Sequence, residues 1–148
     1  MIREFRTNDI APTTTLRLSV RENILSDPSL VTDEMVNVAV TKAGRGWVWE
    51  EDRTILGFSI ALLDEEYHGP RIWALFVTPG CERRGIGRAL LDKAVAWLWS
   101  MDVSRIFLST DPGTRAERFY RESGWQAGRT LENGEIEFSL ERPSATRQ

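Results

Sequence analysis

The feature that most constrains the fold is an apolar stretch, Arg71–Val77, that is followed by a loop, a long amphipathic segment and a second apolar stretch, Arg105–Ser109. A stretch that is apolar at nearly every position is typical of a central strand buried on both faces of a sheet. Between the two stretches, apolar residues recur at helical spacing up to about Met101. A strand, a helix and a second strand of these lengths form a crossover unit, so we expect the two strands to lie parallel in one sheet.

The rest of the chain predicts helices and strands in mixed order, without internal repeats. Before the crossover unit we expect a first strand, a helix that reaches about Leu25, a helix that ends near Gly44 and a hairpin, at residues 2–6, 7–25, 32–44 and 47–63. After it, a short helix from Thr114 has Gly124 as its C-cap, and two last strands join at Asn133-Gly134, which is a strong hairpin signal. The expected fold class is α/β (α+β), with a mixed central sheet.

Length and composition limit the classes of protein that the chain can belong to. A length of 148 residues favours one domain, which we place at 1–142, with 143–148 as a flexible tail. A net charge of -3 is a poor footprint for nucleic acid, and no apolar run approaches the roughly 20 residues of a membrane helix. The single cysteine, Cys81, argues against a disulfide framework and a cysteine metal cluster, so we expect no metal. Because the start lacks the apolar stretch of a secretion signal, the expected compartment is the cytoplasm.

The loop "RRGIGRALL", residues 83–91, stands between the first strand and the helix and predicts an anion site. Glycines at a helix start expose backbone N–H groups at the positive end of the helix dipole, where phosphate commonly binds. The alternative is an ordinary loop with a glycine N-cap. The sequence does not match a Walker loop, because Gly85 is followed by Ile86 and Gly87, with neither Lys nor Ser. A dinucleotide fingerprint would place its third glycine at Leu90, so a dinucleotide enzyme is the weaker alternative.

Two segments in order, "IWALFVTPGCERRGIGRALL" and "RAERFYRESGW", resemble the signature of the GNAT N-acetyltransferases. That signature is an apolar strand, a [RQ]xxGx[GA] pyrophosphate loop that opens a helix, and an A-x-x-F/L-Y-x-x-x-G-F/W segment. The match is most specific over residues 71–126, and the order of elements fits over nearly the whole chain. The resemblance implies a sheet of about six to seven strands flanked by about four helices, with a splayed parallel pair that admits coenzyme A.

The resemblance also implies that the ligand is acetyl-CoA, used as the acyl donor. The backbone of the central strand would pair with the pantetheine arm, and main-chain amides of the loop would hold the pyrophosphate. The residues that match these roles are Leu75, Phe76 and Val77 for pantetheine and Arg83, Arg84, Gly85, Ile86, Gly87, Arg88 and Ala89 for the pyrophosphate. The chain departs from the motif at Glu82, where the family usually has Arg or Gln, which puts the affinity for coenzyme A in doubt.

Tyr120 matches the family residue that protonates the departing thiolate. A phenol with a pKa of about 10 stays protonated at neutral pH and can act as a general acid. The alternative is a core residue beside Phe119. Many relatives also place a glutamate base on the central strand or the next one, and neither strand has a carboxylate here. The substitutes are water or side chains near neighbouring strand ends, namely Glu50, Glu51, Asp64, Glu65, Glu66 and His68.

The sequence gives weaker indications of the acceptor, which the family makes a primary amine of a small molecule or a peptide. Arg17, Arg21 and Glu22 lie at helical spacing where the family commonly builds its acceptor pocket, although surface charge explains them equally well. Three tryptophans, Trp47, Trp49 and Trp73, either line an aromatic wall or fill the core, and core is the expectation for at least two of them. The main alternative function is a non-catalytic acyl-CoA-binding or interaction module. Pairing of two copies as a homodimer stays open.

Overall fold

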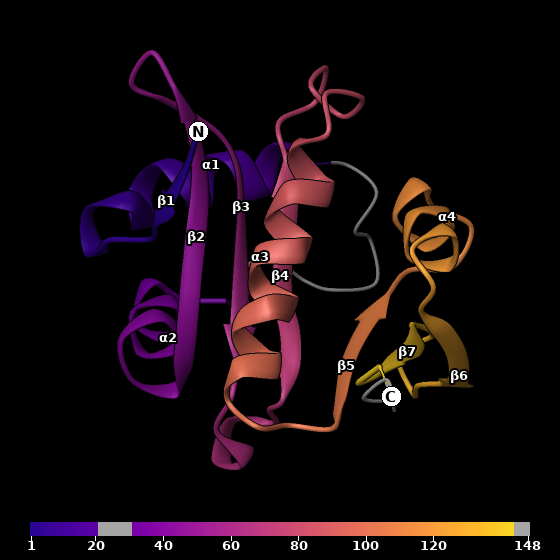
Figure 1. Cartoon of the computed structure of the whole chain (residues 1–148). Coiled ribbons are helices and arrows are strands. Elements are labelled where there is room, and N and C mark those ends of the chain that lie inside the picture. The colour runs from indigo at the N-terminus through magenta and orange to yellow at the C-terminus, as the bar shows by residue number, and fades with distance from the viewer. Residues whose placement is uncertain (21–30, 144–148) are drawn as a thin grey trace, which may run out of the picture.

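A computed structural model gives the structure of the protein and describes residues 1–20 and 31–143. A seven-stranded mixed sheet in the order β1-β2-β3-β4-β5-β7-β6 runs through the molecule (Figure 1), as the sequence predicts. The strands are β1 Ile2–Glu4, β2 Gly44–Glu51, β3 Thr54–Leu62, β4 Arg71–Val77, β5 Arg105–Thr110, β6 Gln126–Thr130 and β7 Ile136–Glu141. The α-helices are α1 Ile10–Ser19, α2 Asp33–Val38, α3 Ile86–Ser100 and α4 Arg115–Glu122. Shorter helical turns lie at Thr7–Asp9, Ala39–Ala43 and Glu65–Tyr67.

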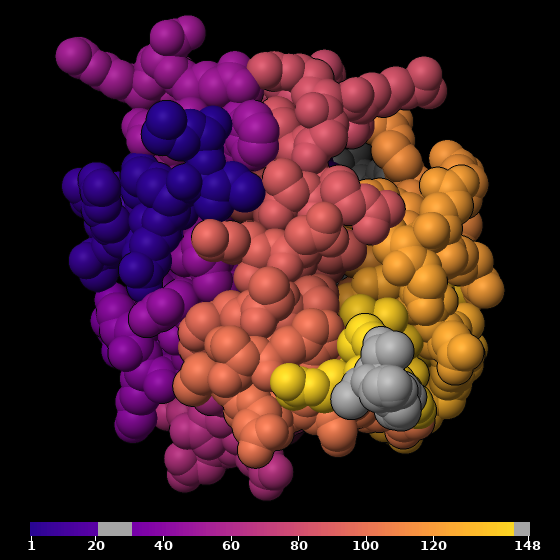
Figure 2. Space-filling model, in the orientation of Figure 1, coloured from indigo at the N-terminus to yellow at the C-terminus, as the bar shows by residue number. Residues whose placement is uncertain are grey.

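Both faces of the sheet are covered by helices. On one face the apolar side of α3, including Leu90, Leu91 and Leu98, packs on the strands around Ile72. On the other face α1 and α2 cover β3, where Phe58 is a fully enclosed core residue. Figure 2 shows that the side chains of α3 fill the middle of the face in view, between the N-terminal strands and the β5–β7 part of the sheet. β4 is therefore a central strand between two cores, as its continuous apolar stretch predicts.

Turn chemistry explains the hairpin between β2 and β3. Asp52 and Arg53 connect the strands with φ angles of 48° and 66°, both positive, which is the geometry of a type I′ turn. Such a turn matches the right-handed twist of the strands it joins, and the two strands pair antiparallel from Gly44 to Glu51. The predicted β6–β7 hairpin is also present.

The ends of α4 are fixed by two caps. The Thr114 hydroxyl accepts a hydrogen bond from the Glu117 amide at 3.2 Å at the start of the helix. At its end Gly124 takes a φ of 92°, and the Trp125 amide donates back to the Tyr120 carbonyl at 3.1 Å. These are the features of a glycine-closed helix terminus, and they fix Tyr120 and Trp125 relative to each other.

The expectation of a first helix that reaches about Leu25 is wrong. α1 ends at Ser19, where the Ser19 hydroxyl donates to the Leu16 carbonyl at 2.5 Å and Val20 turns to extended backbone with ψ 125°. The side chain thus satisfies a carbonyl that a longer helix would have used. Residues 21–30 and the tail expected at 143–148, from residue 144 onward, lie outside the described residues.

The parallel pair β4 and β5 is splayed. Its one register pair is Arg71 with Phe107, and the Phe107 amide donates to the Pro70 carbonyl at 3.2 Å. The antiparallel neighbours stay paired along their length, β3 with β4 from Gly57 to Leu62 and β5 with β7 from Arg105 to Thr110. β4 and β5 therefore separate toward their carboxyl ends, which opens the sheet in its middle (Figure 1).

Candidate active site

A cavity of about 1000 Å³ lies where β4 and β5 separate. Its walls come from α1, β3, β4, the loop before α3, the carboxyl half of β5 and the inner side of α4. Figure 2 shows a recess between the loop before α3 and α4, at the upper right. The cavity has the size of a small-molecule site, and its position follows from the splay.

A bulge in β4 orients the residues that line this cavity. Ile60 of β3 pairs with Ala74 and the next residue, Ala61, pairs with Ile72, so Trp73 is the additional residue. As a result Trp73 and Ala74 both pack toward the α1 side of the sheet, whereas Ile72 and Leu75 pack toward α3.

Leu75, Phe76 and Val77, the three residues predicted to meet pantetheine, all line the cavity. Within the described residues, the edge of β4 that faces β5 has no strand partner beyond Arg71. An exposed strand edge of this kind presents N–H and C=O groups to an extended ligand.

The loop before α3 presents a second set of backbone donors. Gly85 is the N-cap of α3 with a φ of 81°, and its carbonyl accepts from the Ala89 amide at 3.0 Å. The amides of the first turn, at Ile86, Gly87 and Arg88, have no partner within the helix because of α-helix geometry. A Cβ at Gly85 would meet no atom within 4 Å, and one at Gly87 would meet Val77 Cγ2 at 3.5 Å, so neither glycine is crowded on its Cβ side. The binding of an anion by these amides stays a prediction.

The arginines of the loop differ in where their side chains lie. Arg83 and Arg88 line the cavity, and the Arg88 guanidinium lies 5.1 Å from the centre of the Phe119 ring. Arg84 is engaged elsewhere: its side chain hydrogen-bonds to Glu51 at 2.6 Å and its amide donates to the Cys81 carbonyl at 3.4 Å. Of the three, Arg83 and Arg88 are placed to face a bound anion.

Glu82, the departure from the family motif, joins the two sides of the cavity. Its carboxylate accepts from the Gly80 amide at 3.0 Å and pairs with Arg115 of α4 at 3.0 Å. Hydrogen bonds from its own amide and that of Gly80, together with Arg115, hold the pKa of Glu82 below its usual value. An ionised carboxylate therefore lies beside the anion site, where it opposes the binding of a phosphate.

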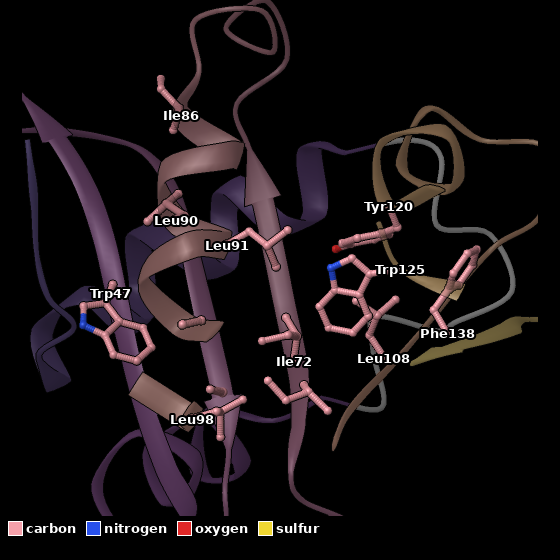
Figure 3. Packing of buried hydrophobic residues seen from close by; sticks show 13 residues of the cluster. Trp47, Ile72, Ile86, Leu90, Leu91, Leu98, Leu108, Tyr120, Trp125 and Phe138 are labelled. Atoms are coloured by element: carbon pink, nitrogen blue, oxygen red, sulfur yellow. The ribbon is translucent and has the colours of Figure 1, made fainter. Parts of the chain in front are cut away.

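Tyr120 projects from α4 into the same cavity. Its ring packs edge-on against Trp125, with centroids 5.9 Å apart, and lies 6.2 Å from Phe138. Figure 3 shows the hydroxyl end of the ring directed toward β4. Burial raises the pKa of the phenol well above its ordinary value of 10.0, so the hydroxyl is a proton donor at neutral pH. Tyr120 is thus a core residue and a cavity residue at once, because its ring is packed and its hydroxyl end faces the splay.

Comparison with known proteins identifies the architecture. The model of the acetyltransferase (GNAT) family matches residues 14–125. The chain belongs to the GNAT family. The PaiA N-acetyltransferase of Thermoplasma acidophilum, solved in complex with coenzyme A, superposes with a TM-score of 0.74 over 96% of this chain and 98% of that chain, at 15% identity.

Two relatives with assigned names align with shorter stretches of this GNAT chain. Histone acetyltransferase TAP1 of Glycine max is 31% identical over 77 residues, which are 52% of this chain and 32% of that protein. Peptidyl-lysine N-acetyltransferase YiaC of Escherichia coli is 39% identical over 58 residues, 39% of this chain and 36% of that protein. The matched stretches therefore span about a third of the length of these curated relatives.

The structure shows which of the six candidate bases of this GNAT chain line the cavity. All six lie within the described residues. His68 lines the cavity. Glu50 is hydrogen-bonded to Arg3 at 2.7 Å, and Glu51 accepts from the Trp49 indole and from Arg84. Asp64 caps the turn that contains Glu65 and Glu66, where it accepts from the Glu66 amide at 2.9 Å. His68 is the candidate that the fold brings to the site.

Sequence reasoning missed two carboxylates that line the cavity, Glu122 at the end of α4 and Glu135 before β7. A signal for Glu135 was present. β7 pairs antiparallel with β5, with Ile136 opposite Thr110, so the residue before β7 must lie beyond the carboxyl end of β5. Sequence reasoning could not place Glu135 from this signal, because the hairpin signal alone does not give the order of the last strands in the sheet.

Three further residues line the cavity, namely Arg17 of α1, Trp73 and Arg71. Burial lowers the pKa of both arginines, with partial compensation by acidic residues nearby. Trp47 and Trp49 belong to the core on the α3 side, where the Trp47 ring lies 5.9 Å from that of Trp97. An aromatic wall of three tryptophans is therefore wrong, because alternation along β2 points these two away from the cavity. Arg21 and Glu22 lie outside the described residues.

Among the described residues, no helix is long and apolar enough to cross a bilayer. Nor do the described His, Cys, Asp and Glu side chains gather in any group of three or more that could hold a metal ion.

Proposed function

We propose that the protein is an N-acetyltransferase that transfers the acetyl group of acetyl-CoA to a primary amine by direct attack in a ternary complex. The observation that carries this proposal is the convergence, on one cavity, of an open β4 edge, the first-turn amides of α3 and the Tyr120 hydroxyl. Membership in the GNAT family supports the same activity. We assign the domain to residues 1–142.

The donor would bind along two backbone surfaces. Leu75, Phe76 and Val77 offer main-chain groups to the amide-containing pantetheine arm, as an added strand would use them. The first-turn amides and the side chains of Arg83 and Arg88 offer donors and positive charge to the pyrophosphate. Glycine at 85 and 87 places no side chain beside these amides, which lets phosphate groups approach the backbone closely. The residues present therefore fit the donor.

The chemistry needs an acceptor without its proton, stabilisation of the developing oxyanion and a proton for the leaving thiolate. A β4 amide near Leu75 polarises the thioester carbonyl, and the amine nitrogen bonds to the carbonyl carbon. The Tyr120 hydroxyl hydrogen-bonds to the sulfur and gives it a proton as the carbon–sulfur bond breaks. The proton lost by the amine leaves through water or His68, and Tyr120 regains one from the solvent in the cavity.

The proposal is tested by release of free thiol from acetyl-CoA with a panel of amines, combined with the mass gain of the acceptor. Tyr120→Phe should lower turnover about 100-fold, the scale of losing an acid–base group, and leave coenzyme A binding nearly unchanged. Tyr67→Phe is a matched control, because it removes a hydroxyl from the other tyrosine that lines the cavity. Equal rates for the wild type and Tyr120→Phe would reject the assigned role.

A second function is favoured by one observation. The sequences of β4 and β5, RIWALFV and RIFLST, present no carboxylate to the cavity, and a module that binds acyl-CoA without turnover would need none. Tight binding of acetyl-CoA without thiol release, for every amine in the panel, would favour that module over an enzyme.

A further inference from the structure

Arg71 at the start of β4 is a cation inside the cavity whose hydrogen-bond partner is a neutral hydroxyl. Its guanidinium donates to the Ser109 Oγ of β5 at 3.3 Å. Among the described residues, no carboxylate oxygen lies within the 4.0 Å of an ion pair with Arg71. A guanidinium has five N–H donors, and one weak bond to a hydroxyl uses few of them.

The surroundings of Arg71 make this arrangement costly in the free protein. Burial lowers the pKa of Arg71, and the negative charges of Glu137 and Glu135 compensate in part. Glu137 is itself bound to Arg129 at 3.3 Å, so it is shared with a competing cation. Desolvation of a partly buried cation without a close counter-ion costs free energy, and an anion that binds beside it in the cavity would offset that cost.

Arg71 lies at the closed end of the splay, away from the loop that we assign to the pyrophosphate. Arg71 holds the last register pair of β4 with β5, opposite Phe107, and Ser109 lies two residues further toward the opening. The guanidinium therefore reaches to about the level of Trp73, roughly 7 Å short of Leu75 along the strand at the usual rise per residue. Arg17 of α1 lines the same cavity. An anionic group at Arg71 would thus lie about 7 Å, measured along the strand, from the level of Leu75, near which we place the reacting carbonyl.

We propose that Arg71 binds a carboxylate of the acceptor, so that the acceptor is an amine that carries a carboxylate a few bonds from its nitrogen. This inference rests on the proposed acetyltransferase function and specifies its substrate class. The carboxylate pairs with the guanidinium in the two-pronged geometry that arginine favours, and the amine is directed toward the thioester. Arg71 acts in binding and specificity, and the arriving carboxylate takes the place of the weak bond to the Ser109 hydroxyl.

The experiment compares ω-amino acids of two to six carbons with their carboxamides, which differ only in the charged group. A second arm compares a peptide that begins Gly-Asp with one that begins Gly-Asn, and separates free amino acids from acidic peptides as the source of the carboxylate. The rate of thiol release gives kcat and KM for each pair. Binding of each compound to the protein saturated with coenzyme A is measured by the shift in thermal unfolding, so one readout is independent of turnover.

The wild type should prefer the acid to the amide by about 10- to 100-fold in kcat/KM, mainly through KM, which is the scale of one hydrogen-bonded charge pair. Arg71→Gln should remove this preference, with the change mainly in KM for the acid. Arg45→Gln is the matched control, because Arg45 is an exposed arginine that pairs with Glu4 outside the cavity wall. It should keep the full preference.

Two further variants test whether Arg71 acts only by stabilising the fold. Arg71→Lys retains the charge and should retain part of the preference even if Arg71→Gln is unstable. Ser109→Ala removes the tie between β4 and β5 and should keep the preference, whereas a purely structural Arg71 predicts the same loss in both variants. Acids and amides that bind and react equally in the wild type would overturn the inference while the acetyltransferase stands. If no amine releases thiol, the proposed function fails, and selective binding of the acids then still decides the role of Arg71.

Discussion

Replacing Gly87 with alanine should stabilise the free protein and leave its binding of coenzyme A nearly unchanged, whereas Gly87→Leu should weaken that binding. Gly87 is the second residue of α3, and the new Cβ would meet only Val77 Cγ2, at the ordinary contact distance of 3.5 Å. Alanine is better than glycine in a helix by about 0.5–1 kcal/mol, which raises the Tm of a chain of this size by roughly 1–4 °C. The pyrophosphate-loop motif accepts Gly or Ala at this position, so one methyl group should leave room for the ligand, whereas a leucine side chain would compete with the pyrophosphate for the space at these amides.

The expected loss in affinity for Gly87→Leu is larger than the gain in stability for Gly87→Ala. A pyrophosphate held away from the amides loses one or two charge-assisted hydrogen bonds, each about 1.5–3 kcal/mol, so Kd should rise at least about tenfold. Thermal unfolding without ligand measures the first effect, and calorimetric titration with coenzyme A measures the second. An unchanged Kd for Gly87→Leu would refute the assignment, because a large side chain at these amides would then be shown to meet no ligand. A lower Tm for Gly87→Ala would show that the account of the helix start is wrong.

Three other variants test separate parts of the structure. Glu82→Gln removes a carboxylate from beside the anion site and should tighten coenzyme A binding about threefold to tenfold, an effect that falls with added salt; a weaker complex would contradict it. Gly85→Ala and Gly113→Ala both place a Cβ at a positive φ, 81° and 76°, with no atom within 4 Å. Each should cost about 1 kcal/mol of stability, and only Gly85→Ala should lose coenzyme A affinity. Arg3→Met leaves the buried Asp9 carboxylate without its partner at 2.8 Å and should cost about 2 kcal/mol at pH 7, since the Arg3 side chain is 21% exposed. The loss of stability should be smaller in acid. Burial opposes the ionisation of Asp9, but hydrogen bonds from Arg3 and a backbone amide lower the pKa of its carboxyl below 3.8. In the wild type this stabilisation is therefore present at neutral pH and disappears as the pH falls through that lowered pKa.

The elements that depend on local chemistry could be predicted from the sequence. The apolar stretch 71–77 is β4 with the same bounds, because a central strand needs apolar residues on both faces. Thr114 and Gly124 cap α4 as expected, since a hydroxyl and a residue that accepts positive φ are what those positions require. The splay followed from the resemblance to the GNAT family and not from the pattern of residues.

The parts that depend on tertiary contacts could not be predicted. Nothing near Glu51 in the sequence indicates that it binds Arg84, since the two are brought together by the packing of the β2–β3 turn on the loop before α3. In the same way the partner of Glu82 is Arg115, which comes from α4 across the cavity. The cavity position of Arg71 also depends on the bulge at Trp73, which shows only when the register of β3 and β4 is known.

The structure of the protein with acetyl-CoA bound is the most direct test of the central claim, that the start of α3 holds the pyrophosphate and directs the thioester toward Tyr120. The account predicts pyrophosphate oxygens at about 2.7–3.2 Å from amides between Gly85 and Ala89, with the sulfur within hydrogen-bond reach of the Tyr120 hydroxyl. A pyrophosphate bound elsewhere, or a thioester on the far side of β4 from Tyr120, would contradict it.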